Sequence, residues 1–210
     1  MKTGIKICGI TDPEIAKNAV ELGANYIGLM CYEASSRFVD AAKRKLIVKA
    51  VKKAGGIPVL VFVDADAEEM AAACDELDVE FVQLHGNISR NESVFLPDEV
   101  HRIYVLHVDE AGVVQPDVDE GLRKLNMARD CVMYDGLQGG SGRRFHLDGF
   151  SNIYPMPFFL AGGLAADNVV EAIQTVHPDA VDVSSGVEDS PGVKSIEKIK
   201  AFIDAVRSVP

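Results

Sequence analysis

The chain contains 210 residues with a mass of 22.6 kDa, and its 48% hydrophobic and 25% charged residues exclude intrinsic disorder, collagen-like repeats and a disulfide-stapled miniprotein. The 21 basic and 32 acidic residues give a formal charge of −11, which argues against nucleic acid or an anionic membrane as a partner. No apolar run approaches the roughly 18 residues of a membrane span, and the N-terminal residues lack the apolar core of a signal peptide, so we expect a cytoplasmic protein.

Eight short apolar or β-branched runs predict β-strands, and most of them are followed by a segment with helical periodicity. The predicted strands are residues 5–7, 26–30, 59–63, 81–84, 103–106, 131–134, 158–161 and 181–183. Several lack polar alternation, as expected for strands that are covered on both faces. No linker or low-complexity segment divides the chain, so we expect one domain over residues 1–210.

The predicted helices have recognisable ends and apolar faces. In the first helix Asp12 fits the N-cap, Pro13 the first turn and Gly23 the C-terminal stop. Apolar residues three and four apart form stripes within residues 70–77 of the third helix and 196–206 of the last. Both stripes are expected to face the sheet.

The spacing of the strands favours a single-domain (β/α)₈ TIM barrel. The strand starts are roughly 25 residues apart on average, which suits a strand, a helix and two short loops. The helix after the fourth strand is weakened by Pro97, and the one after the sixth is reduced to about residues 147–153. An open doubly wound sheet is the alternative, because periodicity does not show whether the last strand pairs with the first. In a barrel, functional groups gather at the C-terminal ends of the strands.

Two of these strand ends have the composition of a phosphate-binding site. Gly162 and Gly163 follow the seventh strand, and Ser184, Ser185 and Gly186 follow the eighth. Glycines let a ligand reach backbone N–H groups, serine hydroxyls add donors, and an adjacent helix N-terminus adds partial positive charge. Since strands 7 and 8 are neighbours in a barrel, we expect their loops to bind phosphate together; simple tight turns are the alternative.

Cys8 ends the first strand two residues after Lys6, so their side chains share one face of the strand, while Ile5 and Ile7 share the other. We expect the isoleucines to face the helices and Lys6 to point into the barrel, where Asp182 is the best candidate for the acidic partner it needs. The ammonium is expected to lower the pKa of Cys8 and raise its thiolate fraction. An inert buried thiol is the alternative. The cysteines form no C-x-x-C pair, so free thiols are expected.

Three further features are candidates for the same site. Asp135 ends the sixth strand among apolar and aromatic neighbours, which can keep a carboxyl group protonated as a general acid. Arg37, in the loop after the second strand, can hold a carboxylate through two hydrogen bonds. Gly140 belongs to a glycine-rich loop at residues 139–142 that can close over a ligand. A solvated aspartate, a surface arginine and a plain flexible loop are the respective alternatives.

Two other functions fit parts of this pattern. His85, His107, Asp64 and Asp135 offer ligands for a metal-dependent sugar-phosphate epimerase, although no close His spacing supports a metal site. A non-catalytic phosphosugar-binding barrel is the other alternative, but it has no need of a thiol and a carboxyl group facing each other.

Six motifs, in this order along the chain, resemble those of the phosphoribosylanthranilate isomerase family. They are KICGIT at residues 6–11, SSRFV at 35–39, QLHG at 83–86, Asp135 with GGSG at 139–142, LAGGL at 160–164 and DVSSGVE at 182–188. The resemblance runs from the first strand to the final helix. It implies a cofactor-free and metal-free enzyme of tryptophan biosynthesis that converts N-(5-phosphoribosyl)anthranilate to the 1-deoxyribulose 5-phosphate derivative, an Amadori rearrangement.

The resemblance also implies roles for individual residues. Asp135 is the general acid that protonates the furanose ring oxygen, Cys8 the general base that removes the C2′ proton, and Arg37 the ligand of the anthranilate carboxylate. His85 and Asp182 are expected to bind substrate. The expected phosphate ligands are Gly140, Gly162, Gly163, Ser184, Ser185 and Gly186. The expected partner is a small-molecule phosphosugar, and the expected assembly is a monomer or homodimer.

Overall fold

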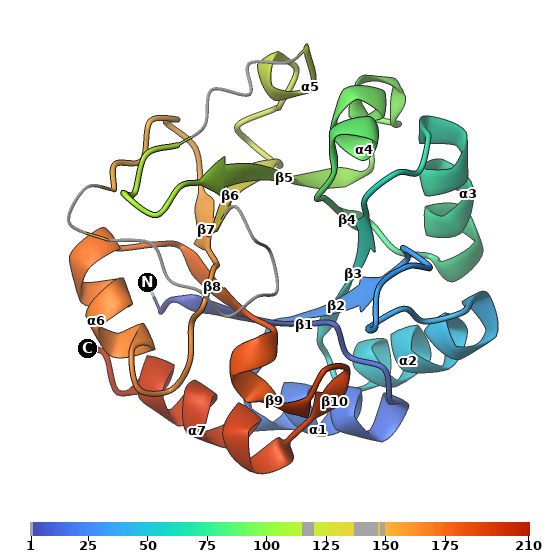
Figure 1. The fold of residues 1–210 in the computed structure, drawn as a ribbon. Coiled ribbons are helices and arrows are strands. Elements are labelled where there is room, and N and C mark those ends of the chain that lie inside the picture. The colour runs from blue at the N-terminus through green and yellow to red at the C-terminus, as the bar shows by residue number, and fades with distance from the viewer. Residues whose placement is uncertain (1, 115–119, 137–146, 148–149) are drawn as a thin grey trace.

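Eight parallel strands close into a barrel in chain order in the computed structural model, which describes residues 2–114, 120–136, 147 and 150–210 (Figure 1). The strands are β1 (Gly4–Cys8), β2 (Tyr26–Met30), β3 (Ile57–Phe62), β4 (Phe81–Leu84), β5 (His101–Val108), β6 (Cys131–Gly136), β7 (Phe158–Leu160) and β8 (Ala180–Val183). Each overlaps a predicted strand. β1 pairs with β8 in a register that sets Lys6 beside Asp182, so the predicted barrel is confirmed and the open sheet is excluded.

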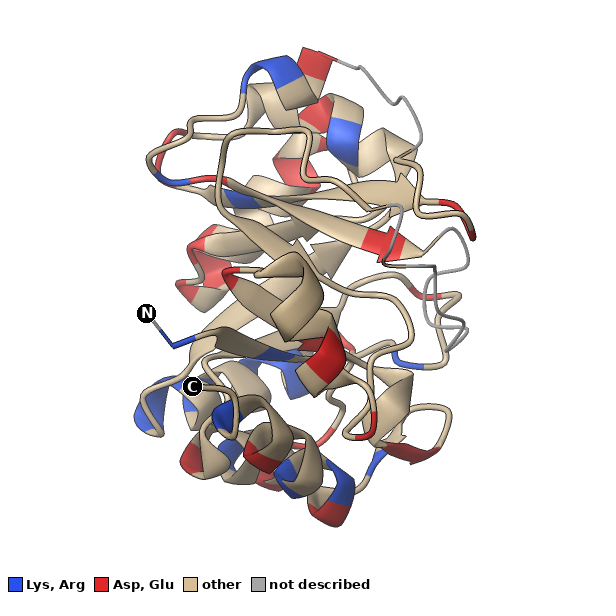
Figure 2. Ribbon diagram, turned by 90° about the vertical axis from the view of Figure 1, so that its left-hand side faces the viewer, with Lys and Arg blue, Asp and Glu red and all other residues tan. Residues whose placement is uncertain are grey.

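The helices surround the barrel (Figure 1). They are α1 (Pro13–Leu22), α2 (Ala41–Lys53), α3 (Ala67–Leu77), α4 (Asn87–Glu92), α5 (Glu120–Arg123), α6 (Val169–Val176) and α7 (Ile196–Arg207). Charged residues are frequent on these outer elements, for example on α1 and α7 at the bottom of Figure 2, whereas the strands are mostly uncharged. Within the described ranges, no helix has the length and apolar character needed to span a membrane.

The helix ends and apolar faces follow from the residues predicted to form them. Asp12 accepts hydrogen bonds from two N–H groups in the first turn of α1, and Gly23 ends that helix with a φ of 121°, a value that favours glycine. The apolar stripes of α3 and α7 are buried through Met70, Cys74 and Leu77, and through Ile199 and neighbouring residues. These predictions are therefore confirmed.

The connections after β4, β6 and β8 differ from a regular β/α unit, and α5, after β5, has only four residues. After β4, α4 has six residues and continues as a 3₁₀ turn, η1 (Ser93–Phe95), shortly before Pro97, as the sequence predicted. The segment predicted as a weak helix at residues 147–153 contains no α-helix in its described part. After β8 the chain forms a 3₁₀ turn, η3 (Ser185–Val187), and an unpredicted antiparallel hairpin of β9 (Glu188–Ser190) and β10 (Val193–Lys194).

The apolar core has two parts because strand side chains alternate between the two faces of the barrel wall. Ile5 and Ile7 are fully buried between the strands and the helices, as predicted. Inside the barrel a smaller cluster, which includes Ile103, Val105 and Met133, fills the space below the strand ends. This packed interior leaves the C-terminal ends of the strands to carry polar groups.

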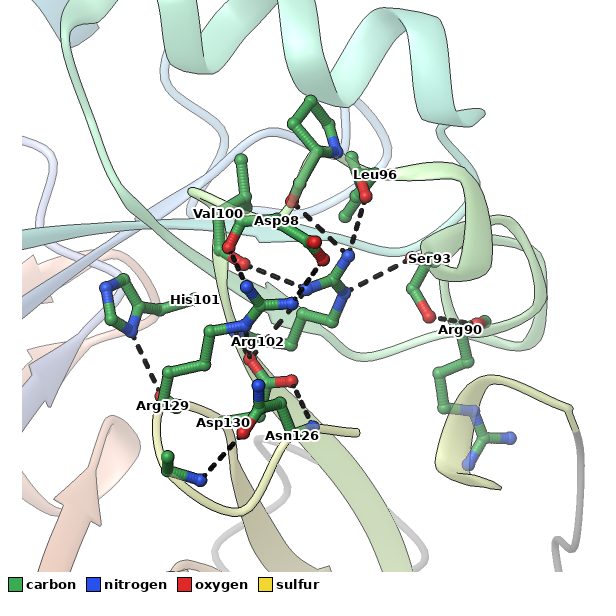
Figure 3. Close-up of polar contacts among 12 residues, drawn as sticks. Arg90, Ser93, Leu96, Asp98, Val100, His101, Arg102, Asn126, Arg129 and Asp130 are labelled. Atoms are coloured by element: carbon green, nitrogen blue, oxygen red, sulfur yellow. Dashed lines mark hydrogen bonds and ion pairs between the residues drawn. The ribbon is translucent and has the colours of Figure 1, made fainter. Parts of the chain in front are cut away.

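A buried arginine, Arg102, stabilises the segment between β4 and β5, in which the helix α4 is short (Figure 3). The Arg102 guanidinium at the start of β5 donates to the carbonyl groups of Ser93, Leu96 and Val100 at 3.2, 2.7 and 3.0 Å. The carboxylate of Asp130 accepts from the backbone N–H of Arg102 at 3.0 Å and lies 3.9 Å from its guanidinium. Because each carbonyl is buried, these bonds satisfy groups that a longer helix would have paired internally.

Candidate active site

A buried ion pair lies beneath the candidate catalytic residues. Lys6 on β1 is fully buried, and its Nζ donates to Oδ1 of Asp182 on β8 at 2.7 Å. The expected partner is thus confirmed. Burial alone lowers the pKa of Lys6, but the charges of Asp182 and Cys8 outweigh it and raise the pKa above its ordinary value. Lys6 therefore remains a cation inside the barrel.

Removing only the Lys6 charge is expected to be costly, because the Lys6→Met variant leaves the buried Asp182 carboxylate without its cation. The expected loss is about 3–5 kcal/mol in the free energy of unfolding, measured by urea denaturation. Lys17→Met is the matched control, since Lys17 is 45% exposed and pairs loosely with Glu21 at 3.5 Å. Two equally stable variants would contradict a structural role for the buried pair.

Cys8 lies close to this pair and is itself 6% exposed. Burial raises the pKa of the Cys8 thiol, while the positive charges of Lys6 and Lys194 lower it by less. The prediction of an increased thiolate fraction is therefore wrong for this structure, because desolvation exceeds the attraction of the ammonium. A Cβ added at Gly28 on β2 would lie 2.7 Å from the Cys8 sulfur and 3.0 Å from Lys6 Nζ, so only glycine leaves room for both groups.

Asp135 is the penultimate residue of β6 and is 7% exposed. Burial, assisted by the negative charge of Asp182, raises the pKa of Asp135 to about 7. This agrees with the expectation of a carboxyl group that keeps its proton near neutral pH. The charges of Lys6 and Asp182 contribute to the pKa of both Asp135 and Cys8.

His85 and His107 form a neighbouring pair of imidazole rings. Their ring centroids are 5.7 Å apart in an edge-to-face arrangement, and His107 on β5 is in register with Asp135 on β6. Burial, followed by the charge of His107, lowers the pKa of His85 to about 4, so His85 is neutral at pH 7. Asp64, the other candidate ligand of the epimerase alternative, lines a separate surface pocket with Cys31 and Arg44. No group of three or more metal-ligating side chains occurs among the residues described here.

The loops after β7 and β8 pack directly against each other. Gly162 and Gly163 have φ values of 91° and 69°, which favour glycine. A Cβ added at Gly186 would lie 2.1 Å from the carbonyl oxygen of Leu164, so the second loop needs glycine for close approach to the first. Asn168 fastens the first loop by accepting from Ala165 N–H at 2.8 Å and donating to the Gly163 carbonyl at 2.9 Å.

The remaining predicted phosphate ligands are placed as follows. Ser184 and Ser185 follow β8 at the start of η3, and the Ser184 hydroxyl accepts from Lys194 Nζ at 3.2 Å. Gly140 lies outside the described residues, as does the whole loop at 139–142.

Arg37 lies in the loop between β2 and α2, as predicted, and its guanidinium binds Glu188 of β9 through two bonds of 2.8 Å. No role was predicted for Glu188, the last residue of the motif at residues 182–188, or for Lys194. The signal that could have revealed them is their charge: an acid and a base six residues apart in the segment that follows the eighth strand.

A closed (β/α)₈ barrel that carries a thiol, a carboxyl group with a pKa of about 7 and two glycine-rich loops at the C-terminal ends of its strands has the groups that an acid–base isomerase needs. The family model for N-(5'phosphoribosyl)anthranilate (PRA) isomerase matches residues 5–205, and the chain belongs to this family of tryptophan biosynthesis enzymes.

Individual relatives agree with this assignment. The isomerase of Acidithiobacillus ferrooxidans is 40% identical over 209 residues, which cover 97% of each chain. The crystal structure of the Thermus thermophilus enzyme has a TM-score of 0.82 at 28% identity and covers 99% of this chain and 100% of its own. A further isomerase structure, in complex with reduced 1-(o-carboxyphenylamino)-1-deoxyribulose 5-phosphate, has a TM-score of 0.72 at 29% identity and covers 98% of both chains. These findings support the isomerase and neither the epimerase nor the binding barrel.

Proposed function

We propose that this chain performs the Amadori rearrangement of N-(5-phosphoribosyl)anthranilate with Asp135 as general acid and Cys8 as general base. The observation that carries the proposal is the pair of buried groups over Lys6 and Asp182, one of them an acid with a pKa of about 7. Asp135 protonates the furanose ring oxygen, and the ring opens to a Schiff base. Cys8 then removes the C2′ proton to give the enolamine, which tautomerises to the ketone.

The raised pKa of Cys8 is compatible with its role as a base once the ring has opened. The protonated Schiff base places a positive charge next to C2′, close to where the thiol must act, and a nearby cation favours the thiolate. The same charge acidifies the C2′ hydrogen. Lys6 adds a permanent cation below the sulfur. We propose that the thiol proton passes to the Asp135 carboxylate that remains after the ring oxygen has been protonated, which leaves the thiolate to remove the C2′ proton.

We propose that the substrate is held at both ends. The ligand in the related complex carries a carboxyl group at one end and a phosphate at the other, as its name states. In this chain Arg37 is proposed to bind the carboxylate, while Gly162, Gly163, Ser184, Ser185 and Gly186, with Gly140, bind the phosphate. His85 and Asp182 are proposed to contact the sugar between them. Charges fixed at two ends orient the reacting carbon between acid and base.

The Arg37→Ala variant is expected to raise KM by about ten- to a hundredfold with a much smaller change in kcat, because the lost interaction binds substrate and transition state alike. The measurement is a steady-state assay of the purified variant. Arg44→Ala is the control, since Arg44 donates to Cys31 in the separate surface pocket. An unchanged KM in the Arg37 variant would remove Arg37 from the site.

The activity itself is tested by generating the unstable substrate in situ and following the loss of anthranilate-type fluorescence on addition of purified protein. Turnover is expected to survive dialysis against EDTA, because the proposed steps use only side-chain acids and bases. Loss of fluorescence that depends on an added metal ion would contradict the proposal.

We further propose that residues 1–210 form one domain, that the protein acts in the cytoplasm, and that it is a monomer or homodimer. The four free thiols support a reducing compartment. Light scattering on the purified chain distinguishes the two assemblies.

A further inference from the structure

Glu188 occupies one edge of the guanidinium of Arg37. Arg37 Nε donates to Oε1 and Nη2 donates to Oε2 of Glu188, both at 2.8 Å. A guanidinium has five N–H donors arranged around a plane, so this pairing uses one edge and leaves the Nη1–Nη2 edge directed elsewhere. A carboxylate that binds Arg37 must therefore approach along that second edge.

Glu188 is itself held firmly. Its side chain is 5% exposed, and Lys194 Nζ, on a side chain that is 1% exposed, donates to Glu188 Oε1 at 2.7 Å. Lys194 also donates to the carbonyl oxygen of Ser184 at 3.0 Å. Burial raises the pKa of Glu188, but the hydrogen bonds from Arg37 and Lys194 outweigh it and keep the pKa below its ordinary value. Glu188 is thus a fixed anion that links Arg37 to the loop after β8.

The hairpin that carries Glu188 is fastened to two other loops at the mouth of the barrel. A Cβ added at Gly192, whose φ is 83°, would lie 2.7 Å from the carbonyl oxygen of Ser36, next to Arg37 in sequence. The hydroxyl of Thr11, in the loop after β1, donates to the Gly192 carbonyl at 3.1 Å. The β9–β10 hairpin therefore packs against the loops that follow β1 and β2 while Lys194 ties it to the loop that follows β8.

We propose that Glu188 is a positioning residue that aims the Nη1–Nη2 edge of Arg37 at the carboxylate of the substrate, and that Lys194 makes this arrangement electrostatically favourable. Arg37 and Glu188 alone would be a neutral pair. With Lys194 the cluster holds two cations and one anion, which leaves one positive charge for the incoming carboxylate. A fixed guanidinium also loses less side-chain entropy on binding. This inference rests on the proposed role of Arg37.

The test compares Glu188→Gln with Asp189→Asn, the adjacent acid of β9, which is 61% exposed and pairs with Lys198 at 2.8 Å. Glu188→Gln keeps the shape of the side chain but removes its charge and one acceptor oxygen. We expect KM to rise roughly tenfold with kcat nearly unchanged. Competitive inhibition by anthranilate should weaken by a similar factor, whereas inhibition by inorganic phosphate should stay as in the unsubstituted enzyme. Asp189→Asn should match the unsubstituted enzyme in KM, in kcat and in its inhibition by anthranilate and by phosphate.

The outcomes separate this inference from the proposed function. If Arg37→Ala raises KM and Glu188→Gln does not, Glu188 has no positioning role and only this inference is overturned. If Arg37→Ala leaves KM unchanged, the assignment of the carboxylate to Arg37 is itself wrong. Weakened phosphate inhibition in Glu188→Gln would mean general damage at the barrel mouth and would also overturn the inference. Should Glu188→Gln not fold, Glu188→Asp retains the charge on a shorter side chain and is expected to show the same selective rise in KM.

Discussion

Replacement of Cys8 by serine is expected to lower kcat by on the order of 10²-fold to 10⁴-fold. A serine hydroxyl in the same place is a far weaker acid than a thiol, so it cannot supply a comparable base when the Schiff base forms. Binding should change little, because the carboxylate and phosphate ligands are untouched. Steady-state kinetics of the purified variant give both quantities.

Cys74→Ser is the matched control for this prediction. Cys74 is a buried thiol on the barrel-facing side of α3, and burial raises its pKa to about 12, so it is inert at neutral pH. The control substitution has the same chemistry but lies outside the barrel. Near-normal turnover by Cys8→Ser, or an equal loss in Cys74→Ser, would refute the assignment of Cys8 as the base.

Asp135→Asn is expected to lower kcat by a similar order of magnitude, 10²-fold to 10⁴-fold, because an amide N–H is far too weak an acid to protonate the ring oxygen. Asp64→Asn is the control, since Asp64 lies at a strand end but in the separate surface pocket. Loss of activity in both variants would indicate an effect of surface charge rather than of a specific acid.

The pH profile provides a second test of Asp135. The profile of kcat/KM reports enzyme in which Asp135 is protonated and Cys8 is ionised. Asp135 loses its proton near pH 7, whereas burial raises the pKa of Cys8 above its ordinary value and so above the pKa of Asp135. The product of the two fractions therefore rises with pH up to about 7 and then levels off. Asp135→Asn should lack this break, and a break that persists would contradict the assignment.

Asp135→Asn should raise the free energy of unfolding while it lowers kcat. The pKa of about 7 in the folded protein exceeds the ordinary value of 3.8, so the folded state binds the proton more tightly than the unfolded state does. The free energy of unfolding consequently falls as pH rises from about 4 to about 7, and it stays at this lower value at higher pH because ionising the buried Asp135 carboxyl group costs free energy. The amide removes this cost, so the variant should be more stable than the unsubstituted enzyme at pH 8 by up to a few kcal/mol.

Much of this architecture follows from local sequence signals. Parallel strands buried on both faces leave continuous apolar runs, and helix ends are marked by residues such as Asp12 and Gly23, so eight strands and several helices were predictable. The pairing of Lys6 with Asp182 was also predictable, because side-chain alternation directs a lysine into an apolar interior where it needs an acid.

Other features depend on three-dimensional context. The strands of the β9–β10 hairpin are too short and polar to show periodicity, and Glu188 acquires its role only where the hairpin meets Arg37. The pKa of Cys8 depends on how far desolvation exceeds the charge of Lys6, a balance that residue order does not reveal. The room that Gly28 leaves beside the sulfur is likewise visible only in the register of β1 and β2.

The central claim is that Cys8 takes a proton from carbon while Asp135 gives one to oxygen, in separate steps. Turnover of substrate deuterated at C2′ tests this division most directly. We predict a primary isotope effect on kcat in Cys8→Ser, in which removal of the C2′ hydrogen becomes the slow step, and an isotope effect near unity in Asp135→Asn, in which ring opening is slow. The reverse assignment of the two isotope effects would contradict the account.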